Sequence, residues 1–199
     1  MNTALVPVGS TLVVPSKRLH TAGFDGLDES DQAIPYIRVV QPTSTECKLM
    51  DGSDAKAGQF YDTALMKAHN ELQFAVLSVA KFDVTWQEDK EPQRIYLLLC
   101  ADRDYFPFVL KVSGTSVFAL KQLITSITRT GVAASWYFWV RAITEKREST
   151  KDGQPRKWFS IRFYIIGEAD EQELQIFADM TGKYTLGEAL PPLEPDEIA

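Results

Sequence analysis

The segment from Trp136 to Ile166 interleaves basic and aromatic residues, a combination suited to a ligand that carries both negative charge and flat rings. Between Arg141 and Arg162 it contains seven basic residues and three acidic ones, although the net charge of the whole chain is -6. Positive charge is therefore concentrated in one part of an acidic protein. Binding of an anion depends on where the positive field is focused rather than on net charge alone.

Alternating residue types in this segment predict two antiparallel strands joined by a tight turn. The dipeptide Asp152-Gly153 is typical of a two-residue hairpin turn. Side chains directly opposite each other in such a hairpin share a face of the sheet. The predicted cross-strand pairs are Arg141 with Tyr164, Ile143 with Arg162, and Arg147 with Trp158.

This register sorts the hairpin into two faces of different chemistry. One face, called the mixed face below, combines cations with aromatic rings and comprises Trp139, Arg141, Arg147, Trp158, Arg162 and Tyr164. The other face is apolar and is predicted to be core; it comprises Phe138, Val140, Ala142, Phe159, Ile161, Phe163 and Ile165. Cations can contact phosphates, and a base stacked on an aromatic ring contributes about 1–3 kcal/mol. The mixed face therefore predicts binding of single-stranded nucleic acid.

Further candidates extend this site. Three cations in or beside the turn are predicted to contact phosphates: Lys151, Arg156 and Lys157. Tyr96 and Lys111 are added because they fall on the second and third strands of the fold predicted below, whose face usually binds the ligand. An alternative remains open, in which the rings pack beneath flanking helices or an N-terminal arm and the cations are merely solvated at the hairpin edge.

The rest of the chain supplies the elements that would position this hairpin. Runs of β-branched and aromatic residues predict strands at 34–40, 71–87, 94–100, 107–113, 136–148 and 157–167, with a short strand at the end of the loop before residue 62. A helix is expected from Thr115 or Ser116 to Gly131, where apolar residues recur with helical spacing. A second helix is expected to begin near Asp170.

From residue 71 to residue 167 this order is three strands, a helix and two strands. It matches a mainly β (α+β) fold, the five-stranded Greek-key barrel that binds oligonucleotides or oligosaccharides (OB), with its helix between the third and fourth strands. We expect a flexible N-terminal arm over 1–33, a single OB-like domain over 34–186 with its barrel core at 71–167, and a disordered acidic tail over 187–199.

Composition is that of a globular, water-soluble protein. The chain has 199 residues, 45% of them hydrophobic, and no apolar run approaches the ~20 residues of a membrane span. Without a signal-peptide pattern, a cytoplasmic location is expected, in the host cytoplasm if the protein is phage-encoded. Two isolated cysteines, Cys47 and Cys100, and two isolated histidines predict no disulfide framework, metal site or cofactor.

Enzymatic interpretations find little support in the sequence. There is no glycine-rich phosphate loop and no nucleophile elbow, so we expect the protein not to be an enzyme. A metal-dependent nuclease is the leading catalytic alternative, because Asp62 or Asp83 together with Glu88 and Lys90 could hold Mg²⁺ and an attacking water. Asp102 and Asp104 are interpreted as residues of a charged turn rather than as a pair of catalytic carboxylates.

Barrel topology, a basic and aromatic hairpin and an acidic tail together resemble single-stranded DNA-binding proteins of bacteriophages and mobile elements. Two segments carry the resemblance to proteins encoded near recombination genes: "GFDGLDESDQAIPYIRVVQPTS" (Gly23 to Ser44) and "CADRDYFP" (Cys100 to Pro107). The resemblance implies a non-catalytic protein that coats single-stranded DNA during replication or recombination. It also implies replication partners docked on the tail, although Ile198 and Ala199 stand where the bacterial family has an aromatic terminus.

Another class of function fits the same pattern. A virion component or assembly adaptor built on a β-barrel would also have long arms and polar loops. The grouping of cations among aromatic rings on one hairpin favours DNA binding over this alternative. Preference for DNA or RNA, the length of the binding site and formation of homo-oligomers stay open at this stage.

Overall fold

The computed structural model describes residues 34–44, 47–84, 93–151, 154–184 and 186. Its contacts divide the chain into two units, Met1–Ala33 and Ile34–Ala199, and every described residue belongs to the second. The arm expected over 1–33 and the tail expected over 187–199 lie outside the described residues. In the part that is described, no helix is long and apolar enough to cross a membrane.

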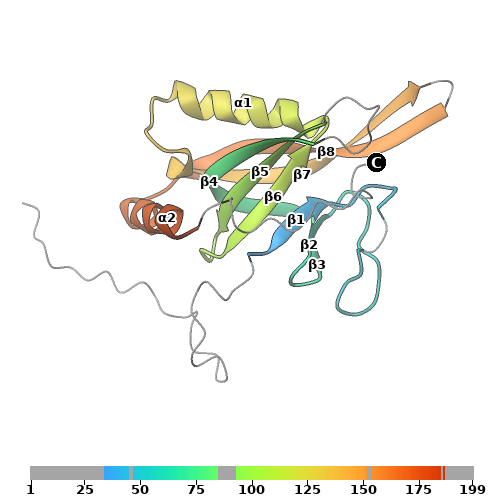
Figure 1. Cartoon of the computed structure of the whole chain (residues 1–199), viewed down its shortest axis with the longest axis horizontal. Helices are drawn as coiled ribbons and strands as arrows, with labels where there is room; N and C mark the ends of the chain where they lie inside the picture. Colours follow the sequence, from blue (N-terminus) through green and yellow to red (C-terminus); the bar gives the residue numbers. More distant parts are fainter. Residues whose placement is uncertain (1–33, 45–46, 85–92, 152–153, 185, 187–199) are drawn as a thin grey trace, which may run out of the picture. The chain divides into compact units, whose positions relative to one another are not determined.

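Eight strands form one curled sheet (Figure 1). In chain order they are β1 (Tyr36–Val39), β2 (Phe60–Asp62), β3 (Lys67–His69), β4 (Glu71–Val84), β5 (Gln93–Asp102), β6 (Pro107–Ser113), β7 (Phe138–Lys151) and β8 (Gln154–Glu168). Their order across the sheet is β3-β2-β1-β6-β5-β4-β7-β8. All neighbours are antiparallel except β1 and β6, which pair in parallel.

Each helix covers a different face of the sheet, as Figure 1 shows. Helix α1 (Ser116–Arg129) buries Leu120, Leu123 and Ile127 against one face. Helix α2 (Glu171–Lys183) buries Phe177 and Met180 against the other. Side chains alternate along a strand, so both faces of the central strands are apolar, and β5 is buried from Leu97 to Ala101. The protein is thus mainly β with two helices.

The expected five-stranded barrel is wrong as a description of this sheet. The five strands of the predicted barrel are present and adjacent, in the order β6-β5-β4-β7-β8, and α1 connects β6 to β7 in the chain. Closing them into a barrel would require the outer strands β6 and β8 to pair. Instead β6 pairs with β1, through Tyr36 opposite Val109 and Ile37 opposite Leu110. A strand from the preceding segment therefore occupies the edge that β8 would have needed.

The segment that follows β1 nevertheless reaches β8. The Gln41 side-chain amide accepts a hydrogen bond from the Phe159 backbone N–H at 2.9 Å and donates one to the Phe159 carbonyl at 2.9 Å. Nearby, the Thr144 hydroxyl donates to the Gly58 carbonyl. These contacts join segments more than eighty positions apart in the chain. They anchor the β7–β8 hairpin to the loop that connects β1 and β2.

Most other elements agree with the sequence analysis, with a few differences. Strand β3 was not predicted, and Trp136 lies in a single 3₁₀ turn (Ser135–Tyr137) ahead of β7 rather than in the strand. Thr115 occupies the N-cap of α1 but makes no side-chain cap. Asp170 caps α2 in a reciprocal box with Glu173, as expected of an acidic residue before an amphipathic run.

Candidate functional site

The predicted register of the hairpin is confirmed. Arg141 lies opposite Tyr164, Ile143 opposite Arg162, and Arg147 opposite Trp158. Lys151 pairs with Gln154, although the turn residues Asp152 and Gly153 lie outside the described residues. The mixed face therefore exists as one surface of β7 and β8.

The opposite face of the hairpin is core, with one exception. Four of its residues are buried against α1 and the sheet: Phe138, Val140, Ala142 and Ile161. Phe163 packs partly against the same core, and Phe159 is half-buried. Ile165 was predicted to be core as well, but it is 38% exposed. A bulge opposite Trp139 and Val140 disturbs the register there, and Ile166 beside it is similarly exposed.

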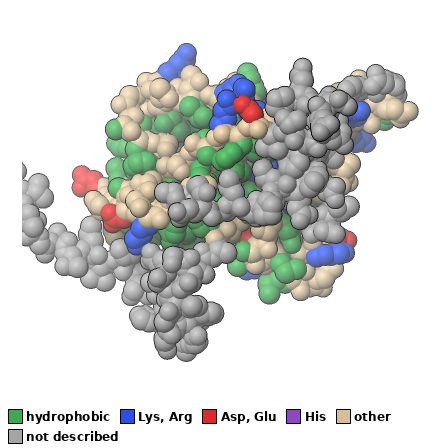
Figure 2. All heavy atoms as spheres, viewed as in Figure 1, with side chains coloured by type: hydrophobic (Ala, Val, Ile, Leu, Met, Phe, Trp, Pro, Cys, Tyr) green, Lys and Arg blue, Asp and Glu red, His purple; other side chains and the backbone are tan. Residues whose placement is uncertain are grey.

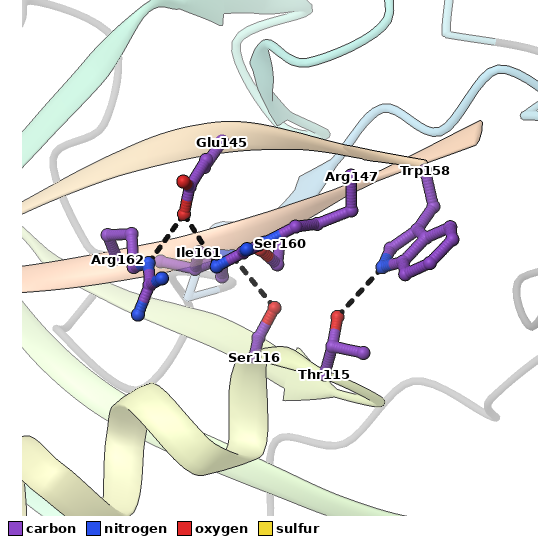
Figure 3. Close-up of polar contacts among 8 residues, drawn as sticks. All are labelled: Thr115, Ser116, Glu145, Arg147, Trp158, Ser160, Ile161 and Arg162. Atoms are coloured by element: carbon purple, nitrogen blue, oxygen red, sulfur yellow. Dashed lines mark hydrogen bonds and ion pairs between the residues drawn. The ribbon is translucent and has the colours of Figure 1, made fainter. Parts of the chain in front are cut away.

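Two arginines of the mixed face share one carboxylate, as Figure 3 shows. Glu145 accepts from Arg147 Nη2 at 2.7 Å and from Arg162 Nε at 2.6 Å. The hydrogen bond from Arg162, with the positive charges of both arginines, holds the pKa of Glu145 below its ordinary value. The three side chains are 34–43% exposed, and exposed ion pairs contribute only about 0–1 kcal/mol. The network therefore orients the two guanidinium groups more than it stabilises the fold.

The start of α1 holds the edge of β8 (Figure 3). Thr115 accepts from the Trp158 indole N–H at 2.9 Å, and Ser116 accepts from the Ile161 backbone N–H at 2.8 Å. Both hydroxyls lie at the helix N-terminus, where such groups usually cap the helix. Here they bind the strand instead. Trp158 is half-buried, with its nitrogen fixed by Thr115.

Two adjoining clefts follow β8 along this boundary. The larger, about 670 Å³, lies between α1 residues such as Gln122 and Ser126 and the strand residues Arg162, Tyr164 and Ile165. The smaller is about 420 Å³. It is lined by Thr115, Phe118, Ala119, Arg147, Glu148, Trp158, Ser160, Ile161 and Arg162. Because Ala119 and Arg162 line both, the clefts adjoin. Aromatic rings thus line both clefts, and Arg162 lies where the two clefts meet.

Trp139 does not serve the role predicted for it. It is 2% exposed and packs edge-on against Phe177 of α2, with ring centroids 5.3 Å apart. Its indole N–H donates to Glu173 at 3.0 Å. A ring covered in this way cannot stack on a base. The alternation placed Trp139 on the correct face, but α2 docks over that part of the face, as the alternative interpretation allowed.

The Trp139 ring instead carries a cation that the sequence analysis missed. The Arg103 guanidinium carbon lies 3.9 Å from the ring centroid. Arg103 belongs to the β5–β6 turn, which was interpreted only as a charged connection. An arginine in this short turn is the only sequence feature that could have suggested the contact. The turn comes close to Trp139 only because β5, β4 and β7 are neighbours in the sheet, and the local sequence does not determine that order.

Arg141 is half-buried on the mixed face. Its guanidinium carbon lies 5.5 Å from the centroid of the Tyr164 ring, and Tyr164 is 45% exposed. The Nε atom of Arg141 is buried and has no hydrogen-bond partner among the described residues. This arginine is therefore ordered by a ring and not by a carboxylate.

The remaining candidates are dispersed. Arg156 is exposed on the mixed face opposite Ser149. Lys157 points to the other face, opposite Glu148, so the structure separates it from the mixed face. The Lys151 side chain lies outside what the structure describes.

Tyr96 and Lys111 were predicted to share the floor of a groove, and this is wrong. Side chains alternate along strands β5 and β6, so Tyr96 packs partly against the core beneath α1, whereas Lys111 lies on the α2 side. Lys111 is also 7% exposed, which leaves it little access to a ligand.

The carboxylates proposed for a nuclease have other structural roles. Asp62 is buried and accepts from the backbone N–H groups of Ala64 and Leu65, both at 2.9 Å. Asp83 pairs with Arg94 at 3.0 Å, which lowers the pKa of Asp83. Glu88 and Lys90 lie outside the described residues. Asp102 accepts from the backbone N–H groups of Asp104 and Phe106, as expected of a turn residue.

Lys and Arg side chains stand in small separate groups on the surface that Figure 2 shows, among hydrophobic and uncharged side chains. This dispersal fits the acidic balance of the whole chain. On this face an anion would therefore meet a few separated cations and not a broad positive field.

A comparison with known proteins gives one match. A family model described as "Pam3 phage gp34-like protein" matches residues 10–93. Within the described residues this range holds β1 to β4 and ends at the start of β5, so it does not include the mixed face. Neither the curated proteins nor the solved structures contain a significant match. The chain is thus similar, over somewhat less than half of its length, to a family of bacteriophage proteins.

Proposed function

We propose that this chain is a non-catalytic bacteriophage protein that binds single-stranded DNA without strong sequence preference, in replication or recombination. The mixed face would bind the strand along β8. Trp158 and Tyr164 would stack on bases, while Arg141, Arg147, Arg156 and Arg162 would contact phosphates.

One observation carries this proposal. Exposed or half-buried aromatic rings alternate with arginines on a single strand face, in the register that places Trp158 beside Arg147 and Tyr164 beside Arg141. A strand that only covers a core does not need guanidinium groups on its outer face. Single-stranded nucleic acid needs both kinds of group, because every base offers a ring and every phosphate a charge.

The order of the strands gives secondary support. The adjacent strands β6-β5-β4-β7-β8, with α1 between β6 and β7, have the sequence of elements expected for an OB-like core. In that fold the loop between the last two strands contacts the ligand. Here these strands are β7 and β8. Strands β1 to β3 would then be an addition to such a core.

The test is a titration of the purified protein against a labelled oligo-dT of about 30 nucleotides. A duplex of the same length and an RNA of the same length are the comparison ligands. We expect tighter binding to the single strand than to the duplex, and a steep loss of affinity between about 50 and 200 mM salt, because each neutralised phosphate releases counterions. Absence of single-strand binding at the lower salt concentration would refute the proposal.

A structural or adaptor role in a virion is the second candidate. Exposed apolar residues on α1 and at the end of β8 favour it: Phe118, Tyr164, Ile165 and Ile166 are 65%, 45%, 38% and 39% exposed, respectively. Apolar surface of this kind is typical of protein contacts. If the titration shows no DNA binding, we expect the variants Phe118→Asp and Ile166→Asp, which introduce a charge on this apolar surface, to prevent incorporation of the protein into phage particles.

A further inference from the structure

We propose that Arg103 and Arg141 form a phosphate-binding subsite at the α2 end of the mixed face, with Gln73 between them. The inference deepens the proposed function, on which its assignment to a DNA phosphate rests. The subsite comprises residues of the β5–β6 turn, β4 and β7, and its ligand is a phosphate group, either in a DNA strand or as a free anion.

Arg103 is held in a fixed position. Its guanidinium carbon lies 3.9 Å from the centroid of the Trp139 ring, and its Nε donates to Gln73 Oε1 at 3.3 Å. Trp139 is itself fixed by Phe177 and Glu173. The turn that bears Arg103 is closed by the backbone bonds from Tyr105 N–H to Asp102 and from Asp102 N–H to Phe106.

Backbone strain in the same turn supports a functional role. Tyr105 has φ of 61°, a conformation that a bulky residue adopts at a cost of about 1–3 kcal/mol. Its ring is anchored on Phe177 of α2, with centroids 6.0 Å apart. Tyr105 therefore ties the turn to α2, and this contact helps to place Arg103 over Trp139.

Arg141 lies beside this position. In the β4–β7 ladder Arg141 is directly opposite Gln73, and Trp139 is opposite Ala75. Directly opposite side chains stand about 5 Å apart, so Gln73, which accepts the hydrogen bond from Arg103, also lies beside Arg141. The buried Nε of Arg141 has no hydrogen-bond partner among the described residues.

Among the described residues, neither Arg103 nor Arg141 has a carboxylate within ion-pair distance, in contrast to the other two arginines at the centre of the mixed face. Arg147 and Arg162 are both bound to Glu145. Two carboxylates are linked to the subsite through other side chains: Glu71 accepts from Gln73 Nε2 at 3.2 Å, and Glu173 accepts from the Trp139 indole N–H at 3.0 Å. The positive charge of Arg103 and Arg141 is therefore available to an external anion.

Phosphate fits this arrangement better than a cationic ligand does. Guanidinium groups bind phosphate through paired N–H donors, and two that flank one amide can hold different oxygens of the same group. Contacts with the Trp139 and Tyr164 rings order both side chains before binding, so less conformational entropy is lost when the anion arrives.

The experiment uses the full chain and three variants. Arg103→Ala combined with Arg141→Ala removes both cations, whereas Gln73→Glu leaves them in place and adds a carboxylate between them. Arg94→Ala is the matched control, because Arg94 is an exposed arginine already paired with Asp83 at 3.0 Å. We measure oligo-dT affinity against salt for each. In parallel, the arginine Nε–H signals of the ¹⁵N-labelled parent are followed by NMR during titration with inorganic phosphate.

We expect the double variant to flatten the slope of log affinity against log salt by about 0.7, since the two arginines neutralise one phosphate and each neutralised phosphate on a single strand contributes about 0.7. Gln73→Glu should act in the same direction, and Arg94→Ala should leave the slope unchanged. Inorganic phosphate should shift the Nε–H signals of Arg103 and Arg141. Shifts with phosphate but no binding of oligo-dT by the parent would support the anion subsite and refute the DNA function. No shift, together with a parent-like slope in both site variants, would overturn the subsite while leaving DNA binding intact.

Discussion

Glu145 decides how much positive charge the mixed face presents. Glu145 accepts hydrogen bonds from both Arg147 and Arg162, so its one negative charge offsets one of their two positive charges and its oxygen fixes the position of both guanidinium groups. We predict that Glu145→Gln raises the affinity for oligo-dT and steepens its salt dependence, because the two guanidinium groups are then uncompensated. Glu148→Gln is the control, since Glu148 pairs with Lys146 rather than with an arginine of the mixed face. An unchanged salt slope in Glu145→Gln would show that Arg147 and Arg162 do not contact the strand.

The same carboxylate gives a pH dependence. The pKa of Glu145 in the folded protein is below its ordinary value of 4.5. Its ion pairs therefore contribute to stability at pH values above the ordinary pKa and lose that contribution as pH falls through the lowered pKa. We expect urea unfolding of the parent and of Glu145→Gln to differ at pH 7 and to converge in acid, below pH 4.5. A difference that persists at pH values where Glu145 is protonated would contradict this assignment.

Trp139 shows how a correct pattern can lead to a wrong role. Its face was predicted correctly, but no local signal indicates that α2 returns over that face more than thirty positions later in the chain. We predict that Trp139→Phe keeps single-strand affinity within about twofold while Trp139→Ala lowers the free energy of unfolding by about 3–5 kcal/mol. Urea denaturation and the oligo-dT titration check the two parts. A large loss of affinity in stably folded Trp139→Phe would show that the indole ring contributes to binding, either directly or through Arg103.

At the scale of elements, the sequence predicts the hairpin well because its determinants are local. The Asp152-Gly153 turn and the alternation of residue types together define the pairing of β7 with β8. Parallel pairing of β1 with β6 depends on residues some seventy positions apart, and the Gln41 contact with Phe159 spans 118 positions. Neither leaves a periodic signal in the chain. The same limit explains why Arg103 was missed and why the pairing of the predicted strand at 34–40 with β6 was not foreseen.

The loop that anchors the hairpin contains a glycine that the packing requires. Gly58 has φ of 89°, and a Cβ at this position would lie 2.5 Å from the Phe159 ring. Gly52 has φ of 82° but has open space around it. We predict that Gly58→Ala is more destabilising than Gly52→Ala, by at least about 1 kcal/mol, because only the former adds a clash to the backbone strain. Equal free energies of unfolding for the two variants would show that the loop does not pack against β8.

For the whole molecule, an acidic chain presents a few ordered cations on one strand face rather than a basic surface. The net charge of -6 does not favour long-range attraction of DNA, so the proposed affinity would depend on contacts at short range. Rings and guanidinium groups fixed by their neighbours suit this task, because little of the binding energy is lost in ordering them. The similarity to a phage protein family covers residues 10–93 and does not extend to this face.

The most direct measurement of the central claim is the change in oligo-dT affinity when Trp158 and Tyr164 are both replaced by Ala. Met50→Ala is the control, because Met50 is 75% exposed and lies outside the hairpin. We predict a loss of at least about 2 kcal/mol, or thirtyfold, with little change in salt slope, since the lost contacts are stacks and not phosphate pairs. Parent-like affinity in a folded double variant would contradict the assignment of the mixed face as a surface for single-stranded DNA.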